Sequence, residues 1–285
     1  MGGEPGLGIG HSGFVEAKAH ASALGDALRI TNHDSPIPVS VLGLCFANPK
    51  IPTDESPLMR IDIWSDVVCP WCWIGKRRFE QAVAALGAQL PALDIHYHAF
   101  ELDPDAGAEP VPLRDALARK FGGAARVDQM LAQTQDTARA EGLPFDFGRG
   151  QVQVSTLRAH RLLWLATHEG DVGAVMEALF HAHFAQGQNV AATDTLLRAG
   201  EAGGLAASRV QAMLDSDEGI VEVQAQLAQA SALGIRAVPS FVIDGRSLIQ
   251  GAQPSETFAQ ALLQLAAESV PIGGADACGP DGCAV

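Results

Sequence analysis

Alternation of apolar and polar residues predicts a β-strand at Arg60–Asp66, with Ile61 and Ile63 on the same side of the strand. Apolar residues at helical spacing then predict a helix from Pro70 to about Leu86. A second strand is predicted at Leu93–Phe100. Because a helix joins the two strands, we expect them to be parallel, with a right-handed crossover.

A long block of helical pattern follows, from about residue 112 to residue 233, and it contains no strand signal. Its segments are rich in alanine, leucine and glutamine, and glycine or proline residues separate them. The predicted helices lie near residues 112–121, 124–142, 155–169, 171–186, 193–203, 205–214 and 219–233.

Strand signals return after this block. Ser240–Ile243 and Ser247–Gln250 flank Asp244-Gly245, a pair typical of hairpin turns, and a last helix is predicted from Pro254 to about Glu268. The order is strand–helix–strand, helical block, strand–strand–helix. It predicts an α/β fold in which a small sheet domain is interrupted by an all-helical insertion.

The same pattern divides the chain into four parts. Residues 1–58 are rich in glycine, serine and proline, which predicts a poorly ordered N-terminal extension. Residues 59–111 and 234–268 would form the sheet domain, and residues 112–233 would form the helical insertion domain. Residues 269–285 are a glycine-rich tail that we expect to be flexible.

Composition and charge narrow the possible function classes. Apolar residues make up 47% of the 285 residues, which is enough for a substantial core. The 33 acidic and 19 basic residues give a formal charge of −14, which argues against nucleic-acid binding. No uncharged apolar run approaches the ~18 residues that span a bilayer, so we expect no membrane protein. Residues 39–47 form the best signal-peptide-like segment, but they lie deep in the chain without a basic region before them. A cytoplasmic location is therefore expected.

The most informative motif is Cys69-Pro70-Trp71-Cys72, which follows the first strand and opens the first helix. Cys69 would occupy the N-cap, where unpaired N–H groups and the helix dipole favour the reactive thiolate. Pro70 suits the first helical position, where its missing N–H would have no partner. Cys72 lies three residues on, close enough to form a disulfide with Cys69. The pattern predicts Cys69 as the attacking nucleophile and Cys72 as the buried resolving thiol, with Pro70 and Trp71 tuning their redox potential.

A second feature is Val238-Pro239 at the start of the third strand, a place where proline needs a special reason. A cis bond there would turn the Val238 backbone toward the cysteines and leave its polar groups free to pair with an extended peptide. The alternative is a trans proline that ends the preceding helix. The combination with the cysteine motif favours the cis form.

The cysteine pairs also have a metal interpretation. CxxC is a spacing found in zinc knuckles, and Cys278 and Cys283 could complete a set of four thiolates in a zinc-binding module without enzyme activity. Zinc knuckles usually lie in glycine-rich hairpins rather than at a junction of strand and helix. We therefore favour redox chemistry and expect no metal.

The CPxC motif after the first strand, the helical block and the Val-Pro pair before a hairpin resemble the DsbA branch of the thioredoxin superfamily, and more closely its FrnE-like subgroup. The resemblance covers about residues 59–268. The stretches that carry it are SDVVCPWCWIGKRRFE (65–80), FELDPD (100–105), AHRLL (159–163) and VPSFVIDGRSLIQGAQP (238–254).

This resemblance implies a thioredoxin-like fold with an inserted all-helical domain. It also implies thiol–disulfide oxidoreductase or isomerase activity on disulfide-containing proteins, with glutathione as a further candidate partner. Cys69 and Cys72 would be the redox pair and Pro239 the cis-proline. No cofactor would be needed, because the cysteines carry the electrons.

The chain departs from the family pattern at one position. Thioredoxin and DsbA carry a buried acid six residues before the first cysteine, where this chain has Ile63. A proton acceptor for Cys72 must then come from elsewhere, and Asp66 is the nearest candidate. Related glutathione-dependent isomerases of the 2-hydroxychromene-2-carboxylate type usually carry serine in place of the first cysteine. Cys69 argues against that chemistry, which stays open as an alternative.

Two further features have more than one interpretation. Cys278 and Cys283 are separated by Gly-Pro-Asp-Gly, which allows a disulfide. They are either a second redox pair that exchanges with Cys69 and Cys72, or an incidental surface pair or metal trap. His160 could line a groove between the domains, but helix packing is the interpretation that we favour.

Overall fold

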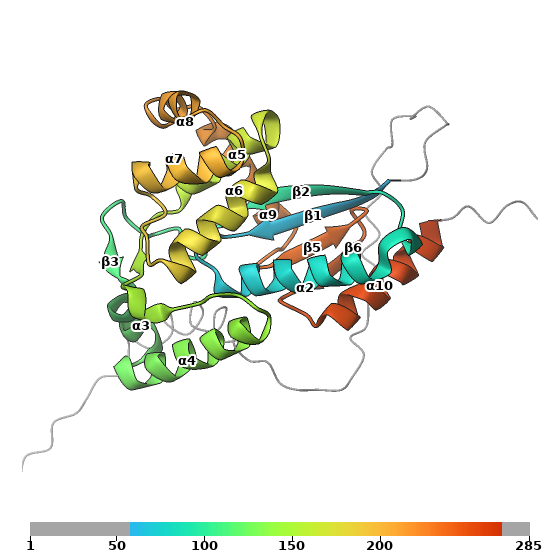
Figure 1. Cartoon of the computed structure of the whole chain (residues 1–285), viewed down its shortest axis with the longest axis horizontal. Coiled ribbons are helices and arrows are strands. Elements are labelled where there is room, and N and C mark those ends of the chain that lie inside the picture. Colours follow the sequence, from blue (N-terminus) through green and yellow to red (C-terminus); the bar gives the residue numbers. More distant parts are fainter. Residues whose placement is uncertain (1–57, 270–285) are drawn as a thin grey trace, which may run out of the picture.

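The protein is described by a computed structural model that covers residues 58–269 (Figure 1). Its centre is a four-stranded sheet in the order β2-β1-β5-β6, formed by β1 (Met59–Ser65), β2 (Leu93–Ala99), β5 (Ser240–Ile243) and β6 (Ser247–Gln250). β1 runs parallel to β2 and antiparallel to β5. The predicted parallel pair, joined by α2 (Pro70–Leu86), is confirmed.

One core packs on the face of the sheet that α2 and α10 (Ser255–Ser269) cover. Every second residue of β1 points into it, so the period-2 pattern of the strand is the cause of this packing. Phe79 of α2 lies 5.4 Å from Phe241, and Phe241 lies 4.7 Å from Phe258 of α10, measured between ring centroids. These aromatic rings hold both helices against the sheet.

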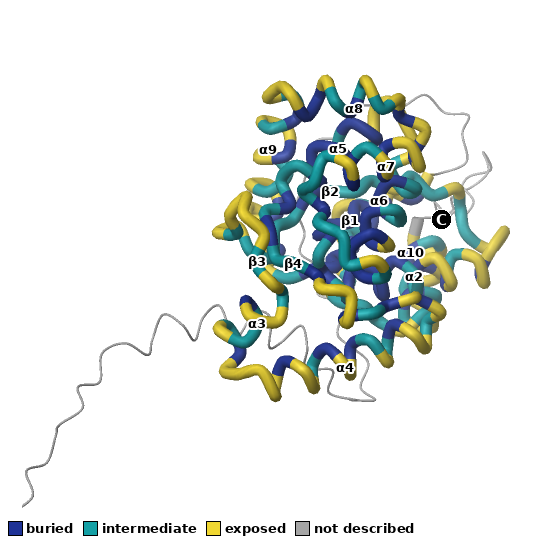
Figure 2. Tube along the Cα trace, turned by 60° about the vertical axis from the view of Figure 1, so that its left-hand side comes forward, coloured by how far each residue is buried: buried dark blue, intermediate teal, exposed yellow. Residues whose placement is uncertain are grey.

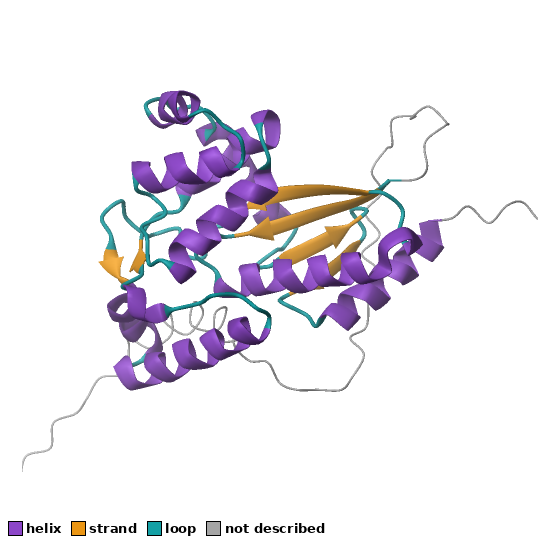
Figure 3. Ribbon diagram, in the orientation of Figure 1, coloured by secondary structure: helices purple, strands orange, loops and turns teal. Residues whose placement is uncertain are grey.

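The chain between β2 and β5 is mainly helical, as predicted. Its elements are α3 (Leu113–Phe121), α4 (Ala124–Ala140), α5 (Leu157–Glu169), α6 (Val172–Phe180), a π-helix (His181–Ala185), α7 (Thr193–Ala202), α8 (Ala207–Leu214) and α9 (Ile220–Ala232). Figure 3 shows these helices in purple beside the orange sheet. Figure 1 shows α3 to α8 gathered around the end of the sheet at which α2 begins.

The expectation that this block contains only helices was wrong at one point. β3 (Val111–Pro112) pairs antiparallel with β4 (Val152–Gln153), and 3₁₀-helices lie at Gly87–Gln89 and Phe147–Arg149. A strand of two residues has no measurable alternation, so its sequence carries no strand signal. The helix predicted near residues 171–186 is also divided, because the π-helix follows α6.

A second core joins the start of α2 to the helical block. Trp73 stacks on three rings contributed by that block, at centroid distances of 5.2 Å for Phe145, 5.8 Å for Phe180 and 6.1 Å for Phe184. The cysteine motif belongs to the same buried cluster. Figure 2 shows buried positions concentrated around β1, whereas α4 and α8 carry exposed residues on their outer sides.

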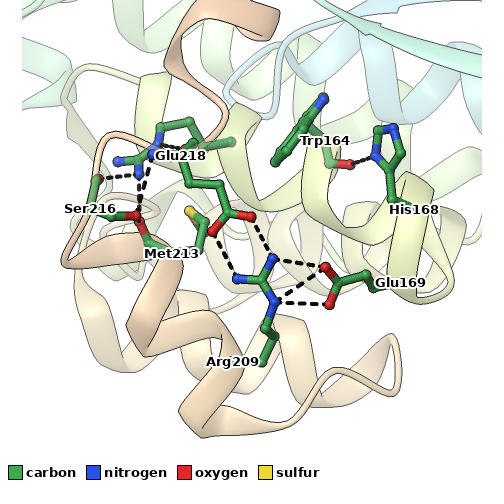
Figure 4. A network of polar contacts seen from close by, with 8 residues as sticks. Trp164, His168, Glu169, Arg209, Met213, Ser216 and Glu218 are labelled. Atoms are coloured by element: carbon green, nitrogen blue, oxygen red, sulfur yellow. Dashed lines mark hydrogen bonds and ion pairs between the residues drawn. The ribbon is translucent and has the colours of Figure 1, made fainter.

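The loop between α8 and α9 is fixed by a buried arginine of α5. The guanidinium of Arg161 donates hydrogen bonds to the backbone carbonyls of Met213, Ser216 and Glu218. Figure 4 shows this region, with Arg209 pairing with both Glu169 and Glu218 at the surface. Arg161 therefore links the last turn of α8 to the loop that leads to α9.

The predicted extension 1–58 lies outside the described residues except for Leu58, and the predicted tail 269–285 lies outside them except for Ser269. Cys278 and Cys283 belong to that undescribed part. The boundaries of the sheet domain and of the helical insertion domain stay predictions. Within residues 58–269, no helix is long and apolar enough to cross a membrane.

Candidate active site

The two cysteines of the motif lie where the chain leaves β1 and enters α2. Cys69 is the N-cap of α2, with an extended backbone, and Pro70 occupies the first turn. The Cys69 N–H donates to the Asp66 carbonyl at 3.0 Å, and the Cys72 N–H donates to the Cys69 carbonyl at 3.0 Å. These two turns place both sulfurs at the start of one helix, and both are free thiols.

Both thiols are buried, with 3% of Cys69 and 2% of Cys72 exposed. Burial raises the pKa of the Cys69 thiol well above its ordinary value, and the neighbouring Cys72 sulfur and Asp66 carboxylate act in the same direction. The backbone N–H of Cys72 at the start of α2 lowers this pKa, in the direction expected for a helix N-terminus, but burial has the larger effect. The residues that bury the Cys69 thiol come from a distant part of the chain, so the local motif does not predict the burial or the rise in pKa that it causes.

The Val238–Pro239 peptide bond is cis, as the resemblance implied. The Cys69 thiol donates to the Val238 carbonyl, with 3.7 Å between sulfur and oxygen. The Val238 backbone thus faces the cysteines, and its carbonyl is occupied by the thiol rather than free. Behind the proline lies Gly75 of α2, where a Cβ atom would come within 2.8 Å of Pro239 Cγ.

Asp66 is buried beside the motif, with 1% of its surface exposed. Its Oδ2 accepts the Leu102 N–H at 2.8 Å, and its Oδ1 lies 3.5 Å from His160 Nε2. The same nitrogen of His160 lies 3.0 Å from the Phe100 carbonyl. His160 belongs to α5, so sequence reasoning that treated it as a packing residue missed its place next to Asp66. No local signal could have found a neighbour so far along the chain.

A second histidine near this cluster is unusual. His183 is fully buried in the π-helix, and neither ring nitrogen has a hydrogen-bond partner among the described residues. Burial lowers the pKa of His183 to about 4, and the Asp66 carboxylate acts in the opposite direction. The imidazole is therefore neutral at neutral pH. π-Helical turns are frequent near functional sites.

A pocket of about 250 Å³ opens beside this site. Its lining comes from the loop after β2, from the end of α9 and from the segment that leads to Pro239: Phe100, Glu101, Pro104, Leu227, Ala230, Ser231, Ile235 and Arg236. The floor is apolar and Arg236 at its edge is exposed.

No group of three or more histidine, cysteine or acidic residues that could hold a metal occurs among residues 58–269. His98, for example, contacts other side chains of the protein. Its Nε2 lies 2.7 Å from Asp62 Oδ1, and its ring stacks on Trp64 at a centroid distance of 4.5 Å. Within the described part of the chain, Cys69 and Cys72 thus supply two thiolates without a third ligand.

Comparisons with known proteins agree with this geometry. A probable DsbA oxidoreductase from Streptomyces coelicolor is 37% identical, with a TM-score of 0.70, over 80% of this chain and 99% of that one. The uncharacterised Bacillus subtilis protein YwbO is 26% identical over 208 residues, which are 72% of this chain and 96% of that protein. A 2-hydroxychromene-2-carboxylate isomerase shares the fold at 16% identity, with a TM-score of 0.55, over 75% of this chain and 100% of that one.

A family model matches across most of the described region. The model of the DSBA-like thioredoxin domain covers residues 60–263, which include the main sheet except for Met59, both cysteines and the cis-proline. The match extends over well more than half of the chain. The protein therefore belongs to the family of DsbA-like thioredoxin domains.

Proposed function

We propose that the protein is a thiol–disulfide oxidoreductase or isomerase that exchanges disulfides with protein substrates. The observation that carries this proposal is the placement of two free thiols at the start of α2, with the Cys69 sulfur 3.7 Å from the Val238 carbonyl beside the cis-proline. Cys69 attacks and Cys72 resolves. The FrnE-like subgroup stays a prediction.

The proposed exchange balances without a cofactor. The Cys69 thiolate attacks one sulfur of the substrate disulfide, which forms a mixed disulfide and releases the other sulfur as a thiolate. Cys72 then loses its proton and attacks the Cys69 sulfur, which releases the second substrate thiolate and leaves a Cys69–Cys72 disulfide. The substrate gains two electrons and, with protons from solvent, becomes a dithiol. If a different thiolate of the substrate attacks the mixed disulfide instead, a new substrate disulfide forms, Cys69 leaves as a thiolate, and the result is isomerisation.

The substrate chain would bind along the segment before β5. An extended peptide would pair with the Val238 backbone, and a neighbouring side chain would enter the pocket floored by Ile235 and Ala230. We further propose a cytoplasmic location. In a reducing compartment the cysteine pair would be largely reduced, so reduction or isomerisation is expected rather than net oxidation.

A redox titration tests this proposal. The protein is equilibrated in a series of glutathione redox buffers, its thiols are trapped by alkylation, and peptide masses report each cysteine. We expect a cooperative Cys69–Cys72 disulfide. A midpoint near about −200 mV would indicate an isomerase or oxidant, and one near about −270 mV a reductase. Failure of this pair to oxidise, with zinc released on unfolding, would contradict the proposal in favour of a metal-binding module.

A second candidate function is a glutathione-dependent isomerase of small molecules. The shared fold with a 2-hydroxychromene-2-carboxylate isomerase favours it. Cys72→Ser separates the two. Glutathione-dependent turnover that survives this change would favour the isomerase, whereas loss of insulin-disulfide reduction would favour dithiol exchange.

The tail pair has its own test. We propose that Cys278 and Cys283 exchange with the Cys69–Cys72 pair. The double substitution Cys278→Ser/Cys283→Ser is expected to slow reduction of the Cys69–Cys72 disulfide by thiols. Unchanged potential and turnover would rule out this exchange.

A further inference from the structure

Two buried polar side chains from distant parts of the chain meet beside the cysteine motif. Asp66 follows β1, and His160 lies in α5, yet Asp66 Oδ1 and His160 Nε2 are 3.5 Å apart. Both residues are at least 98% buried. The rest of the carboxylate is held by backbone, since Oδ2 accepts the Leu102 N–H at 2.8 Å. Burial makes the charge of this carboxylate effective over a longer range than it would be in water.

The Asp66 backbone and side chain both bear on the nucleophile. Its carbonyl accepts the Cys69 N–H at 3.0 Å, which fixes the turn between them. Its carboxylate repels a developing Cys69 thiolate and so adds to the raised pKa of that thiol. The Cys72 sulfur has the same effect from within α2.

Two other titratable groups face this pair. Burial raises the pKa of Glu101, with Asp66 adding to the rise and His160 opposing it. His183 is neutral at neutral pH because burial lowers its pKa to about 4. The Asp66 carboxylate thus acts on Cys69, and the His160 side chain lies beside it together with the backbone N–H groups of Leu102 and Val68.

We propose that the buried Asp66–His160 pair sets how strongly the Cys69 thiolate is repelled by negative charge. His160 of α5 acts on Cys69 through Asp66 and is therefore a positioning residue for the nucleophile. The proposal deepens the proposed function and rests on it for its meaning in catalysis. His160 Nε2 hydrogen-bonds the Phe100 carbonyl at 3.0 Å, and its N–H dipole, 3.5 Å from Asp66 Oδ1, offsets part of the Asp66 charge. Loss of His160 leaves the carboxylate to repel the thiolate fully, and loss of the Asp66 charge removes the repulsion.

The size of the effect follows from the chemistry of thiols. Removal of a close like charge shifts a pKa by about one unit or more. A thiol pKa that is one unit lower gives roughly ten times more thiolate at neutral pH, but each thiolate is about threefold less nucleophilic. The net expectation for Asp66→Asn is alkylation of Cys69 that is roughly threefold faster at neutral pH.

The experiment compares Asp66→Asn, His160→Gln and the double variant in the full chain. Two measurements are made across alkaline pH: iodoacetamide alkylation of Cys69 followed by peptide mass, and the ultraviolet absorbance of the thiolate relative to a Cys69→Ser counterpart. The second does not depend on access of a reagent to the buried sulfur. We expect the Cys69 pKa to fall in Asp66→Asn, to rise in His160→Gln, and in the double variant to match Asp66→Asn.

A matched control is available on the neighbouring strands. Asp62 and His98 form another aspartate–histidine contact, part-buried and 2.7 Å long, between β1 and β2. Asp62→Asn is expected to leave the Cys69 pKa unchanged. Shifts of the same sign in Asp66→Asn and His160→Gln, or no shift in either, would overturn the inference. Asp66→Asn keeps an oxygen for the Leu102 N–H, and thermal unfolding checks that the variants fold.

The outcome is independent of the redox test. If Cys69 and Cys72 never form a disulfide in glutathione buffers, the proposed function fails while the Cys69 pKa of each variant is still measured. If the disulfide forms but the pKa does not follow the two substitutions in opposite directions, only the role of the Asp66–His160 pair fails.

Discussion

At the scale of single residues, Gly75 has space for a hydrogen atom and nothing larger. A Cβ atom there would lie 2.8 Å from Pro239 Cγ and 3.4 Å from Ala252 Cα. The proline ring is rigid, and its backbone is held because the Pro239 carbonyl accepts the Gly251 N–H at 2.7 Å. Gly75 therefore sets how closely α2, with its cysteines, approaches the cis-proline.

We expect Gly75→Ala to destabilise the protein and to slow disulfide exchange. Alanine gains up to about 1 kcal/mol of helix propensity, but overpacking against a rigid neighbour costs about 1–3 kcal/mol. Urea unfolding and the rate of mixed-disulfide formation measure the two effects. The control is Gly107→Ala, whose Cβ would meet nothing closer than 3.9 Å. Equal behaviour of the two variants would contradict the prediction.

The buried His183 makes stability sensitive to acid. In the unfolded chain its pKa returns to about 6.5, whereas in the folded protein burial lowers it to about 4. Stability from this group is present above the unfolded pKa and is lost as the pH falls toward the folded one, by roughly 3 kcal/mol in total. His183→Leu should therefore flatten the fall in unfolding free energy over this range. His168→Leu removes an exposed histidine and should leave the fall in place.

At the scale of elements, α2 and α6 are joined through one carboxylate. Glu177 of α6 accepts hydrogen bonds from Trp73 Nε1 at 3.0 Å, from Lys76 Nζ at 3.0 Å and from Arg77 Nη2 at 2.9 Å. These donors keep the pKa of Glu177 below its usual value against the opposing effect of burial. The helix that carries the cysteines is thereby attached to the helical block by polar contacts as well as by the Trp73 stack.

Glu177→Ala is expected to reduce the free energy of unfolding by about 1–3 kcal/mol, because the Trp73 N–H and the Lys76 ammonium lose a partner. The matched control is Glu80→Ala, which removes the other partner of Lys76 on the same helix. Glu80 is more exposed, so its loss should cost less than about 1 kcal/mol. Urea unfolding compares the two, and equal losses would show that Glu177 adds nothing beyond a surface ion pair.

The helices and strands could be predicted well where the pattern of apolar residues repeats over many positions. The ends of the helix Pro70–Leu86 agree with the structure, because a proline opens it and Gly87 closes it with a positive φ of 48°. The paired strands Val111–Pro112 and Val152–Gln153 could not be predicted, since two residues show no period. The sequence pattern does not distinguish the π-helix His181–Ala185 from a continuation of α6, because both share helical spacing.

At the scale of the whole molecule, the cysteine motif lies inside a core to which β1, α2 and the helical block all contribute residues. Trp71 and Cys72 share one contiguous buried cluster with residues such as Leu162 and Val175 of the helical block. We expect one cooperative unfolding transition rather than separate transitions for sheet and helices.

Thiol trapping during unfolding tests this expectation. Pulsed alkylation of Cys69 in increasing urea should follow the same midpoint as tryptophan fluorescence, because the same core protects both. Cys69 that becomes reactive at a clearly lower urea concentration would show that the helices separate from the sheet first. The variant Glu177→Ala should then widen the gap between the two midpoints.

The candidate site could be predicted only in part, because some of its features depend on the packing of the whole molecule. Cys69, Cys72 and Pro239 are visible in the sequence because local chemistry requires them at fixed spacings. The burial of Cys69 and the meeting of Asp66 with His160 depend on how distant segments pack, which no local pattern records.

The contact between the Cys69 thiol and the Val238 carbonyl has a consequence for turnover. A disulfide sulfur has no hydrogen to donate, so oxidation leaves this buried carbonyl without a partner, at a cost of about 1–3 kcal/mol. A backbone N–H of an incoming chain can restore the bond. We therefore expect the oxidised protein to bind polypeptide more tightly than the reduced protein does. In the reductive direction proposed above, product release would therefore wait for the external thiol that reduces the Cys69–Cys72 disulfide and restores the Cys69 donor.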